Sequence, residues 1–409
     1  MTDSNRVSTG PAGPSKRALY TAYASGGANN AVNMMLRVVV PLWALQLGMS
    51  PSMIGIAIGA GGVLPFLLSI HGGVLMDRFG TRRVNVILTL LGTIAMALYP
   101  LLPIASALIV LQMITGFTTN MGWMGAQSMI VQIAPGDTAV IGKFSIASRV
   151  GTLVAPVLTG AVWDLTGHWG AFLFITISSV ATFLAFYWSP AAEVDATATR
   201  EQTSVRDLIP RFSEYIQAFA MMAVPVIAFV SVITFVRIGG AAVQGSFYIV
   251  YLEHIGISGT MIGVLMGVSE GFGMFGSGIA GRIERALKPH WTLILFHALA
   301  IFFVCVTPFL GGIMVLLVLA AMMRGSSQGL GQPVMFAVLS RAVSREEQGR
   351  SIGLRTTINR ISSMGVPPFM GIIAEHSGLE ASFAITGVIF IGVSLGAVVF
   401  ARGIKAFQG

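Results

Sequence analysis

Four charged residues stand inside long apolar stretches of the sequence: Arg37, Arg237, Glu270 and Arg324. If those stretches cross a membrane, each charge costs about 2.5 to 3.5 kcal/mol on insertion scales, so its presence indicates a task. Glu270 is the only carboxylate at such depth, and it could load and release a proton. Arginine presents a fork of donors that matches carboxylate and phosphate oxygens. The set therefore predicts proton-coupled handling of an organic anion.

Polar residues accompany these charges at the spacing of a helix face. Side chains three, four, seven or eight positions apart lie on one side of a helix. Four such faces occur: Asn30, Asn33 and Arg37; Arg237 and Gln244; Arg324, Gln328 and Gln332; and Gln112, Thr115 and Thr119. We interpret these faces as substrate-binding and Glu270 as the proton-coupling residue. The alternatives are polar packing between helices and, for Glu270, a static ion pair with Arg237.

The composition indicates which elements hold these residues. Hydrophobic residues make up 55% of the chain and charged residues only 10%, whereas about a quarter of a soluble domain is charged. No Asp, Glu, Lys or Arg occurs between Val38 and Met76, or between Val84 and Gly136. A helix needs about 20 apolar residues to cross a bilayer, so each of these runs can hold two crossings. The sequence predicts an all-α membrane protein.

Counting apolar blocks in this way predicts twelve membrane spans. We expect them near residues 19–47, 52–76, 84–101, 105–133, 142–165, 170–189, 219–253, 259–283, 290–308, 312–343, 350–375 and 380–405. The predicted organisation is a lead-in (1–18), a six-helix half (19–189), a linker (190–218), a second six-helix half (219–405) and a short tail (406–409).

Lysine and arginine fall at alternate ends of these spans. Positively charged loops are retained in the cytoplasm, so both termini and the linker are expected there, in a plasma membrane such as the bacterial inner membrane. The formal charge of +8 is then explained by topology and by attraction to anionic lipid, not by nucleic-acid binding.

The two halves repeat one another. The stretch "LGMSPSMIGI" (47–56) matches "IGISGTMIGV" (255–264). Further along, seven residues have counterparts 211 positions later: Gly142, Arg149, Pro156, Gly160, Asp164, Gly167 and Phe172 match Gly353, Arg360, Pro367, Gly371, Glu375, Gly378 and Phe383. Such self-similarity is the signature of an internal repeat. The matched positions of Arg149 and Arg360 favour a shared structural task, such as pairing at a cytoplasmic gate.

The charged stretch "GGVLMDRFGTRR" (72–83) lies between the second and third spans. It resembles the loop motif of the major facilitator superfamily, with Gly73, Asp77, Arg78, Gly80, Arg82 and Arg83 in the motif positions. The resemblance implies two pseudo-symmetric six-helix halves, with helices one, four, seven and ten lining a central cavity. It also implies a conformational latch, in which Gly73 allows close helix approach and Asp77 faces the N-terminus of helix eleven. The alternative is simple anchoring of the loop.

Two motifs typical of drug and proton antiporters in that superfamily are incomplete. Gln112 stands four residues before Gly116, where those antiporters tend to carry arginine, and "GTLVAPVLTG" (151–160) has Ala155 and Thr159 in place of glycines. Because deep arginines outnumber deep carboxylates, we expect a secondary active transporter that moves a small or amphipathic organic carboxylate by alternating access, coupled to protons. Proton-antiport efflux of drugs or metabolites is the alternative.

Enzyme chemistry is not indicated. The six histidines have no metal-ligand spacing of three or four, Cys305 is the single cysteine, and there is no glycine-rich nucleotide loop after a strand. We expect no cofactor and no metal. The expected partners are the small-molecule substrate, protons and membrane lipid, and the chain is expected to be a monomer.

Overall fold

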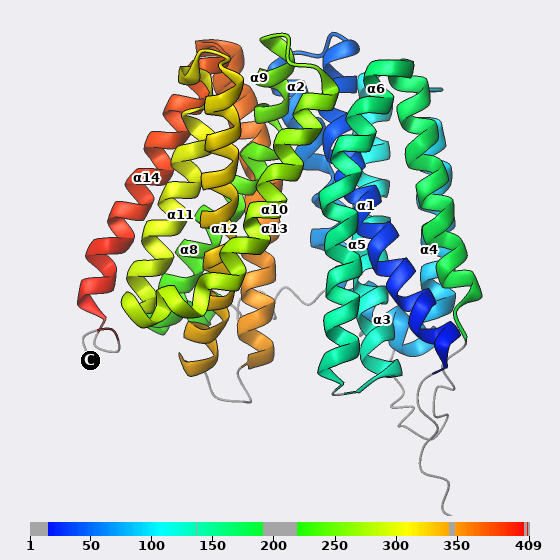
Figure 1. Ribbon diagram of the computed structural model, residues 1–409, viewed down its shortest axis with the longest axis horizontal. Coiled ribbons are helices and arrows are strands. Elements are labelled where there is room, and N and C mark those ends of the chain that lie inside the picture. Colours follow the sequence, from blue (N-terminus) through cyan, green and yellow to red (C-terminus); the bar gives the residue numbers. More distant parts are fainter. Residues whose placement is uncertain (1–14, 136, 191–218, 343–347, 405–406, 408–409) are drawn as a thin grey trace, which may run out of the picture.

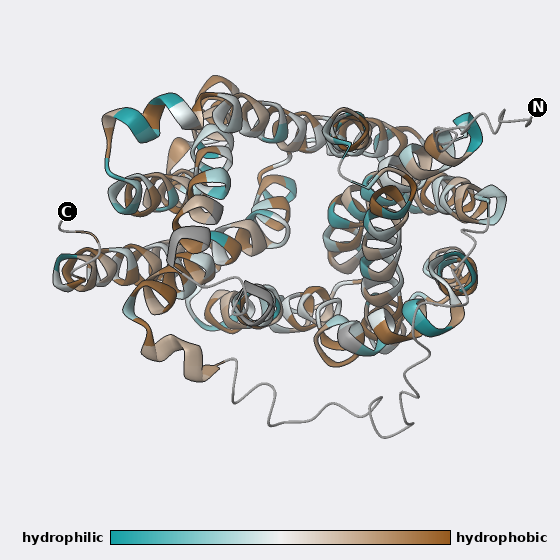
Figure 2. Ribbon diagram, turned by 90° about the horizontal axis from the view of Figure 1, so that it is seen from below, coloured by the Kyte–Doolittle hydropathy of each residue, from teal (hydrophilic) through white to brown (hydrophobic). Residues whose placement is uncertain are grey.

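The computed structural model describes residues 15–135, 137–190, 219–342, 348–404 and 407, and these contain helices and no strand. Two helical bundles stand side by side, one for each half of the sequence (Figures 1 and 2). The predicted all-α fold in two halves is confirmed. The predicted linker, apart from Pro190, lies outside the described residues.

The helices follow the expected order. The first half contains α1 (Lys16–Gln46), α2 (Pro51–Ala60), α3 (Val63–Phe79), α4 (Thr81–Leu98), α5 (Ala105–Ile133) and α6 (Thr138–Trp188). The second contains the short 3-10 helix η2 (Met221–Ala223), α8 (Pro225–Gln244), α9 (Phe247–His254), α10 (Gly259–Ala286), α11 (Pro289–Cys305), η3 (Thr307–Leu310), α12 (Met314–Ala342), α13 (Gln348–Ser377) and α14 (Leu379–Gly403).

Glycines explain how these helices give twelve crossings. Helix α6 reverses direction at Gly167, whose φ of 66° lies in the left-handed region, so it holds two antiparallel spans. Gly378, with a φ of 90°, makes the matching turn between α13 and α14. Glycine adopts such angles without steric cost. Elsewhere one span is interrupted without reversal, as between α2 and α3 and between α8 and α9.

Seven helical segments are long and apolar enough to cross a membrane by length and hydropathy alone, among the residues described. Helices α1, α5 and α13 are not among the seven, although they contain 31, 29 and 30 residues. Each carries several Asn, Gln, Ser or Thr residues along its length. Their polarity is the first indication that they face something other than lipid.

The two ends of the bundle differ in charge. We call the end at which α1 begins the basic end, because it carries the described residues Lys16, Arg17, Arg78, Arg82, Arg83, Lys143, Arg282, Arg285, Lys288 and Arg402. The opposite end, here the acidic end, carries Asp164, Glu253, Glu375 and Glu380 and no described lysine or arginine. The one-sided distribution expected from the sequence is therefore present in three dimensions. Which end faces the cytoplasm stays a prediction.

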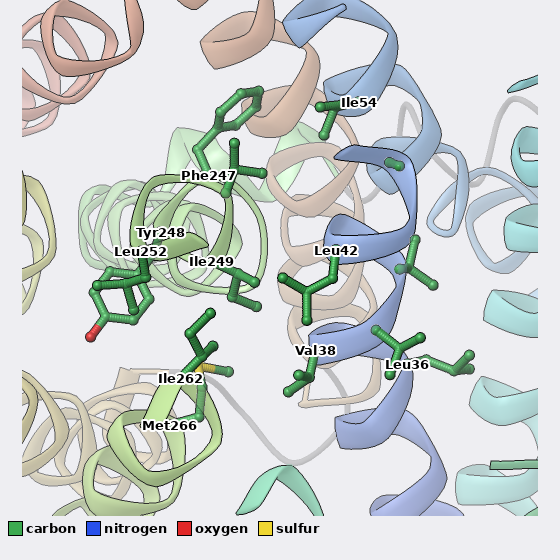
Figure 3. Close-up of a cluster of buried hydrophobic side chains, with 14 of the residues drawn as sticks. Leu36, Val38, Leu42, Ile54, Phe247, Tyr248, Ile249, Leu252, Ile262 and Met266 are labelled. Carbon is green, nitrogen blue, oxygen red and sulfur yellow. The ribbon is translucent and has the colours of Figure 1, made fainter. Parts of the chain in front are cut away.

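The halves meet in an apolar cluster toward the acidic end (Figure 3). Leu42 of α1, Ile54 of α2, Phe247 of α9 and Ile262 of α10 belong to it, and none is more than 2% exposed. Close packing of this kind holds helices together inside a bilayer, where lipid tails are as apolar as leucine. Toward the basic end the two bundles diverge (Figure 1).

Candidate substrate cavity

A cavity of about 490 Å³ lies between the two halves. It is lined by residues of α1, α2 and α5 from the first half, α8 and α13 from the second, and the break between α2 and α3. The volume is in the range of small-molecule sites. Three of its walls are the helices α1, α5 and α13, which are not among the seven segments that are long and apolar enough to cross a membrane by length and hydropathy alone. Each of these three helices places Asn, Gln, Ser or Thr side chains on the cavity lining.

The polar face predicted on α1 is part of this cavity. Asn30, Asn33 and Arg37 all line it, and the Arg37 Nε donates a hydrogen bond of 3.2 Å to the Asn33 Oδ1. Arg37 is exposed although it lies deep in the chain's first helix, because it borders the cavity. Asn29 was not singled out from the sequence. Its side-chain amide donates to the Thr119 carbonyl oxygen at 3.0 Å and holds α1 against α5.

The polar face on α5 is divided between the cavity and the interior of the first half. Gln112 and Thr119 line the cavity. Thr115 does not: it is buried, and its hydroxyl lies 2.9 Å from that of Tyr99. Tyr99 also donates to the Gln112 Oε1 at 2.8 Å, so it fixes the orientation of that amide.

The polar faces on α8 and α12 lie outside the cavity lining in this conformation: Arg237, Gln244, Arg324, Gln328 and Gln332. Gln244 is 4% exposed and donates to the Met266 sulfur. Arg324 is 1% exposed; its Nε donates to the Ser269 hydroxyl at 3.3 Å, and its guanidinium carbon lies 4.5 Å from the Tyr248 ring centre. A cation over an aromatic face is attracted by the ring quadrupole. These contacts belong to the packing of the second half.

Helix α13 contributes a polar face that sequence reasoning missed. Thr356, Asn359, Arg360 and Ser363 line the cavity, and their spacing of three, four and seven could have been recognised. Arg360 donates from a terminal nitrogen to the Asn120 Oδ1 of α5, a bond between the two halves. The Asn359 Oδ1 and the Arg360 Nε have no partner within the described part of the chain. Both atoms are buried in this conformation, so they are polar groups without a hydrogen-bond partner beside the cavity.

Arg149, the counterpart of Arg360 in the repeat, does not line the cavity and is exposed. Arg360 bonds to Asn120, and its pairing with Arg149 at a gate stays a prediction. The matched position in the repeat did not place the two arginines in matching surroundings.

The charges around the cavity are unbalanced. Among its described lining residues, Arg37 and Arg360 are charged and none is a carboxylate. Glu270 of α10 is half-buried and does not line it. Arg37, Arg324 and Arg149 act on Glu270 electrostatically, but no hydrogen bond or ion pair shorter than 4 Å to any described residue holds it.

The static pair of Glu270 with Arg237 is not formed in this structure. The charge that acts on Arg237 is Arg355, a second cation. Arg37 is thus the residue that both lines the cavity and lies within electrostatic range of Glu270.

The loop motif between α3 and α4 forms a tight turn. Gly80, with a φ of 88°, takes a conformation that favours glycine. Arg82 donates to the Tyr187 carbonyl oxygen at 2.5 Å, and Arg78 lies over the Phe79 ring at 5.3 Å. Arg83 is exposed. Arg82 therefore anchors the loop to the end of α6 in this conformation.

The latch contacts expected of this motif are not seen among the described residues. Asp77 is exposed and makes no hydrogen bond to any described residue, and the side chains at the start of α13 lie outside the described part of the chain. The close helix approach expected at Gly73 is wrong for this structure, because a Cβ there would meet no atom within 4 Å. The adjacent Gly72 makes the approach, against the Met121 side chain of α5.

Comparisons with known proteins agree with this architecture. The chain is 25% identical over 313 residues to the class B tetracycline resistance protein of Escherichia coli, with 75% of each chain covered. It is 20% identical over 374 residues to the staphylopine export protein of Staphylococcus aureus, covering 89% of this chain and 91% of that protein.

Solved transporter structures share the fold. The nucleoside transporter NupG superposes with a TM-score of 0.73 at 14% identity, covering 95% of this chain and 100% of that one. A bacterial homolog of the human lysosomal transporter Spinster, in an inward-facing and occupied conformation, gives a TM-score of 0.71 at 14% identity, covering 95% and 97%. The family model for the Major Facilitator Superfamily matches residues 22–323 and again 230–406. The chain belongs to the Major Facilitator Superfamily and is a membrane transporter of that type.

Proposed function

We propose that this protein carries an organic anion with at least one carboxylate group through the central cavity, together with a proton. The observation that carries the proposal is the pair of arginines, Arg37 from the first half and Arg360 from the second, in a cavity with no carboxylate among its described lining residues. A guanidinium fork binds a carboxylate through two parallel hydrogen bonds. An anion is therefore the ligand that balances this cavity.

Binding can be linked to movement because the arginines come from opposite halves. Arg360 already reaches across the cavity to Asn120, a neutral acceptor. A carboxylate is a stronger partner for a guanidinium than an amide oxygen is. A substrate that replaces Asn120 would tie the halves together more tightly in one conformation than in another, and only such differential binding can shift a conformational equilibrium.

Glu270 supports proton coupling through Arg37. A proton on Glu270 removes a negative charge that acts on Arg37, so Arg37 attracts an anion more strongly. By thermodynamic reciprocity the anion then also favours the protonated form of Glu270. Proton and anion bind cooperatively under this mechanism, which gives co-transport.

The basic end is the end that we assign to the cytoplasm, because basic loops are retained there. The packing at the acidic end then closes the cavity toward the outside, and the described conformation is open inward. We expect the protein to function as a monomer, because the two halves of one chain supply all the walls of the cavity.

Proton-antiport efflux of a cationic or neutral compound is the second candidate. Two relatives favour it, since one is named for tetracycline resistance and the other for staphylopine export. The cavity also has apolar lining residues, among them Met34, Ile58, Trp123 and Ile238. For a cation, protonation of Glu270 would oppose binding, because it leaves the cavity more positive. Proton and substrate would then exchange across the membrane.

Counterflow in liposomes separates the two candidates. Purified protein is tested with labelled benzoate, citrate and acetate and with labelled tetraphenylphosphonium. We expect anion counterflow, weakened about 10- to 100-fold in affinity by Arg360→Gln, since a hydrogen bond to a charged group is worth about 1.5 to 3 kcal/mol. Arg285→Gln, a change at the exposed basic end, is the matched control and should have no effect. Counterflow of the cation alone, unchanged by Arg360→Gln, would replace the anion proposal with the efflux alternative.

A further inference from the structure

The acidic end contains a carboxylate that joins the two halves. Asp164 of α6 accepts hydrogen bonds from the Gly259 and Thr260 backbone nitrogens, both at 2.8 Å, and from the Thr260 hydroxyl at 2.6 Å. Gly259 and Thr260 are the first two residues of α10. Their N–H groups have no partner within the helix, and the positive end of the helix dipole favours an anion there.

A second carboxylate repeats this arrangement with the roles of the halves exchanged. Glu375 of α13 accepts from the Ser50 hydroxyl and from the Ser52 backbone nitrogen, both at 3.1 Å. Ser50 is the N-cap of α2, and Ser52 is the second residue of that helix. Asp164 and Glu375 are 211 residues apart, the offset of the internal repeat. The contact therefore obeys the pseudo-symmetry of the molecule.

Close backbone contact brings each carboxylate within reach of its helix. A Cβ on Gly160 of α6 would overlap the Gly259 carbonyl oxygen. Its counterpart Gly371 of α13 lies in the same way against α2, where a Cβ would come within 2.5 Å of the Pro51 carbonyl oxygen. Only residues without a side chain allow this approach. The contact of α6 with α10 and the contact of α13 with α2 therefore each depend on a glycine four residues before the carboxylate.

We propose that Asp164 and Glu375 are positioning residues that form a double latch, which holds the acidic end closed and releases when the cavity opens toward that end. All five hydrogen bonds cross from one half to the other. Separation of the halves at this end breaks them together, while the bonds inside each half survive. Contacts that exist in only one of two conformations set the balance between them. The latch requires alternating access but not an anionic substrate.

Paired spin labels measure this balance directly in the full chain. In a Cys305→Ser background, one pair is placed at the exposed acidic-end positions Leu101 and Ile313, and another at the exposed basic-end positions Phe79 and Leu287. The double variant Asp164→Asn with Glu375→Gln should lengthen the acidic-end distance and shorten the basic-end distance. Each single variant should raise the ratio of open to closed acidic ends about 2- to 30-fold, the range expected for a charge at a helix terminus.

Three further variants distinguish a latch from general damage. Glu380→Gln changes a carboxylate at the same end that makes no hydrogen bond to a described residue, and should leave both distances unchanged. Glu253→Gln removes a like charge that acts on Asp164 and should shift the balance toward the closed acidic end. Thr260→Val deletes a single hydroxyl, so it keeps the test available if a charge variant fails to fold.

The expected result is opening in the latch variants, closing in Glu253→Gln and no change in Glu380→Gln. Unchanged distances in the double variant overturn the proposal. A shift in Glu380→Gln as large as that in Asp164→Asn also overturns it, because charge at the acidic end, not the helix contact, would then be responsible.

Discussion

The two ends of this transporter use similar residues in opposite ways. At the acidic end, Asp164 and Glu375 each accept hydrogen bonds from the start of a helix in the other half. At the basic end, Asp77 is exposed and makes no hydrogen bond to a described residue, and the two bundles diverge (Figure 1). A carboxylate placed near an end of the bundle therefore does not by itself form a contact between the halves. Its effect depends on whether the halves are close enough for it to reach the other helix.

The ends also differ in symmetry. The acidic-end contact occurs twice, at positions related by the repeat. The loop motif at the basic end occurs once, because the corresponding stretch of the second half, "GSGIAGRIER" (276–285), lacks the aspartate. In the described conformation the carboxylates Asp164 and Glu375 join the halves at the acidic end, and Asp77 makes no hydrogen bond to a described residue at the basic end.

The first prediction tests which end faces outward, and its outcome is all or none. Single cysteines at His168 or Ser377 on the acidic end, in a Cys305→Ser background, should react with an impermeant thiol reagent added to intact cells. A cysteine at Leu287 on the basic end should react only after the cells are opened. This labelling pattern is expected because positively charged loops are retained in the cytoplasm. The reverse labelling pattern would invert the assignment of both ends.

The second prediction concerns the residue that links the cavity to the proton. Glu270→Gln should abolish uphill accumulation driven by a pH gradient, because glutamine mimics the protonated carboxyl and cannot release a proton. Exchange of labelled for unlabelled substrate should continue, since both ends can still open in turn. The measurement is accumulation and exchange in the same liposomes. Full accumulation in Glu270→Gln would show that another group carries the proton.

The third prediction tests closure at the acidic end by adding side-chain volume between the halves instead of removing a charge. Gly160→Ala places a methyl group against the Gly259 carbonyl oxygen, so α6 and α10 must move apart. Overpacking costs about 1 to 3 kcal/mol, which corresponds to a 5- to 150-fold shift toward the open acidic end and a comparable loss of transport. Gly142→Ala in the same helix is the matched control, because a Cβ there meets nothing within 4 Å. Equal effects of the two substitutions would contradict the claim that close packing of α6 against α10 holds the acidic end closed.

The fourth prediction addresses the basic end and is the smallest. Asp77→Asn should reduce the transport rate about 2- to 5-fold, the effect of about 0.3 to 1 kcal/mol at a helix terminus. It should leave the spin-label distances of the substrate-free protein unchanged, because Asp77 is not bonded in that state. An altered substrate-free distance would mean that the motif already acts in the described conformation. An unaltered transport rate would leave loop anchoring as its role.

The cavity shows how far sequence patterns lead. Asn30, Asn33 and Arg37 were predicted together and line the cavity together, because one helix face is set by local geometry. The face of Arg324, Gln328 and Gln332 has the same spacing but lies outside the lining in this conformation. Spacing defines which residues share a face. It does not define the direction in which the helix is rotated.

The sequence alone determined the membrane class, the two halves and the positions of the main polar residues, since hydropathy, charge placement and repeats are properties of the chain itself. Tertiary structure decided the rest. It brought Arg360 to Asn120, 240 residues away, and placed Arg37 rather than Arg237 within electrostatic range of Glu270. It also brought Asp164 and Glu375, matched but unexplained in the repeat, to helix termini of the opposite half. The physical reason is that contacts between halves depend on helix rotation and on the conformation adopted, and both are set by packing across the whole molecule.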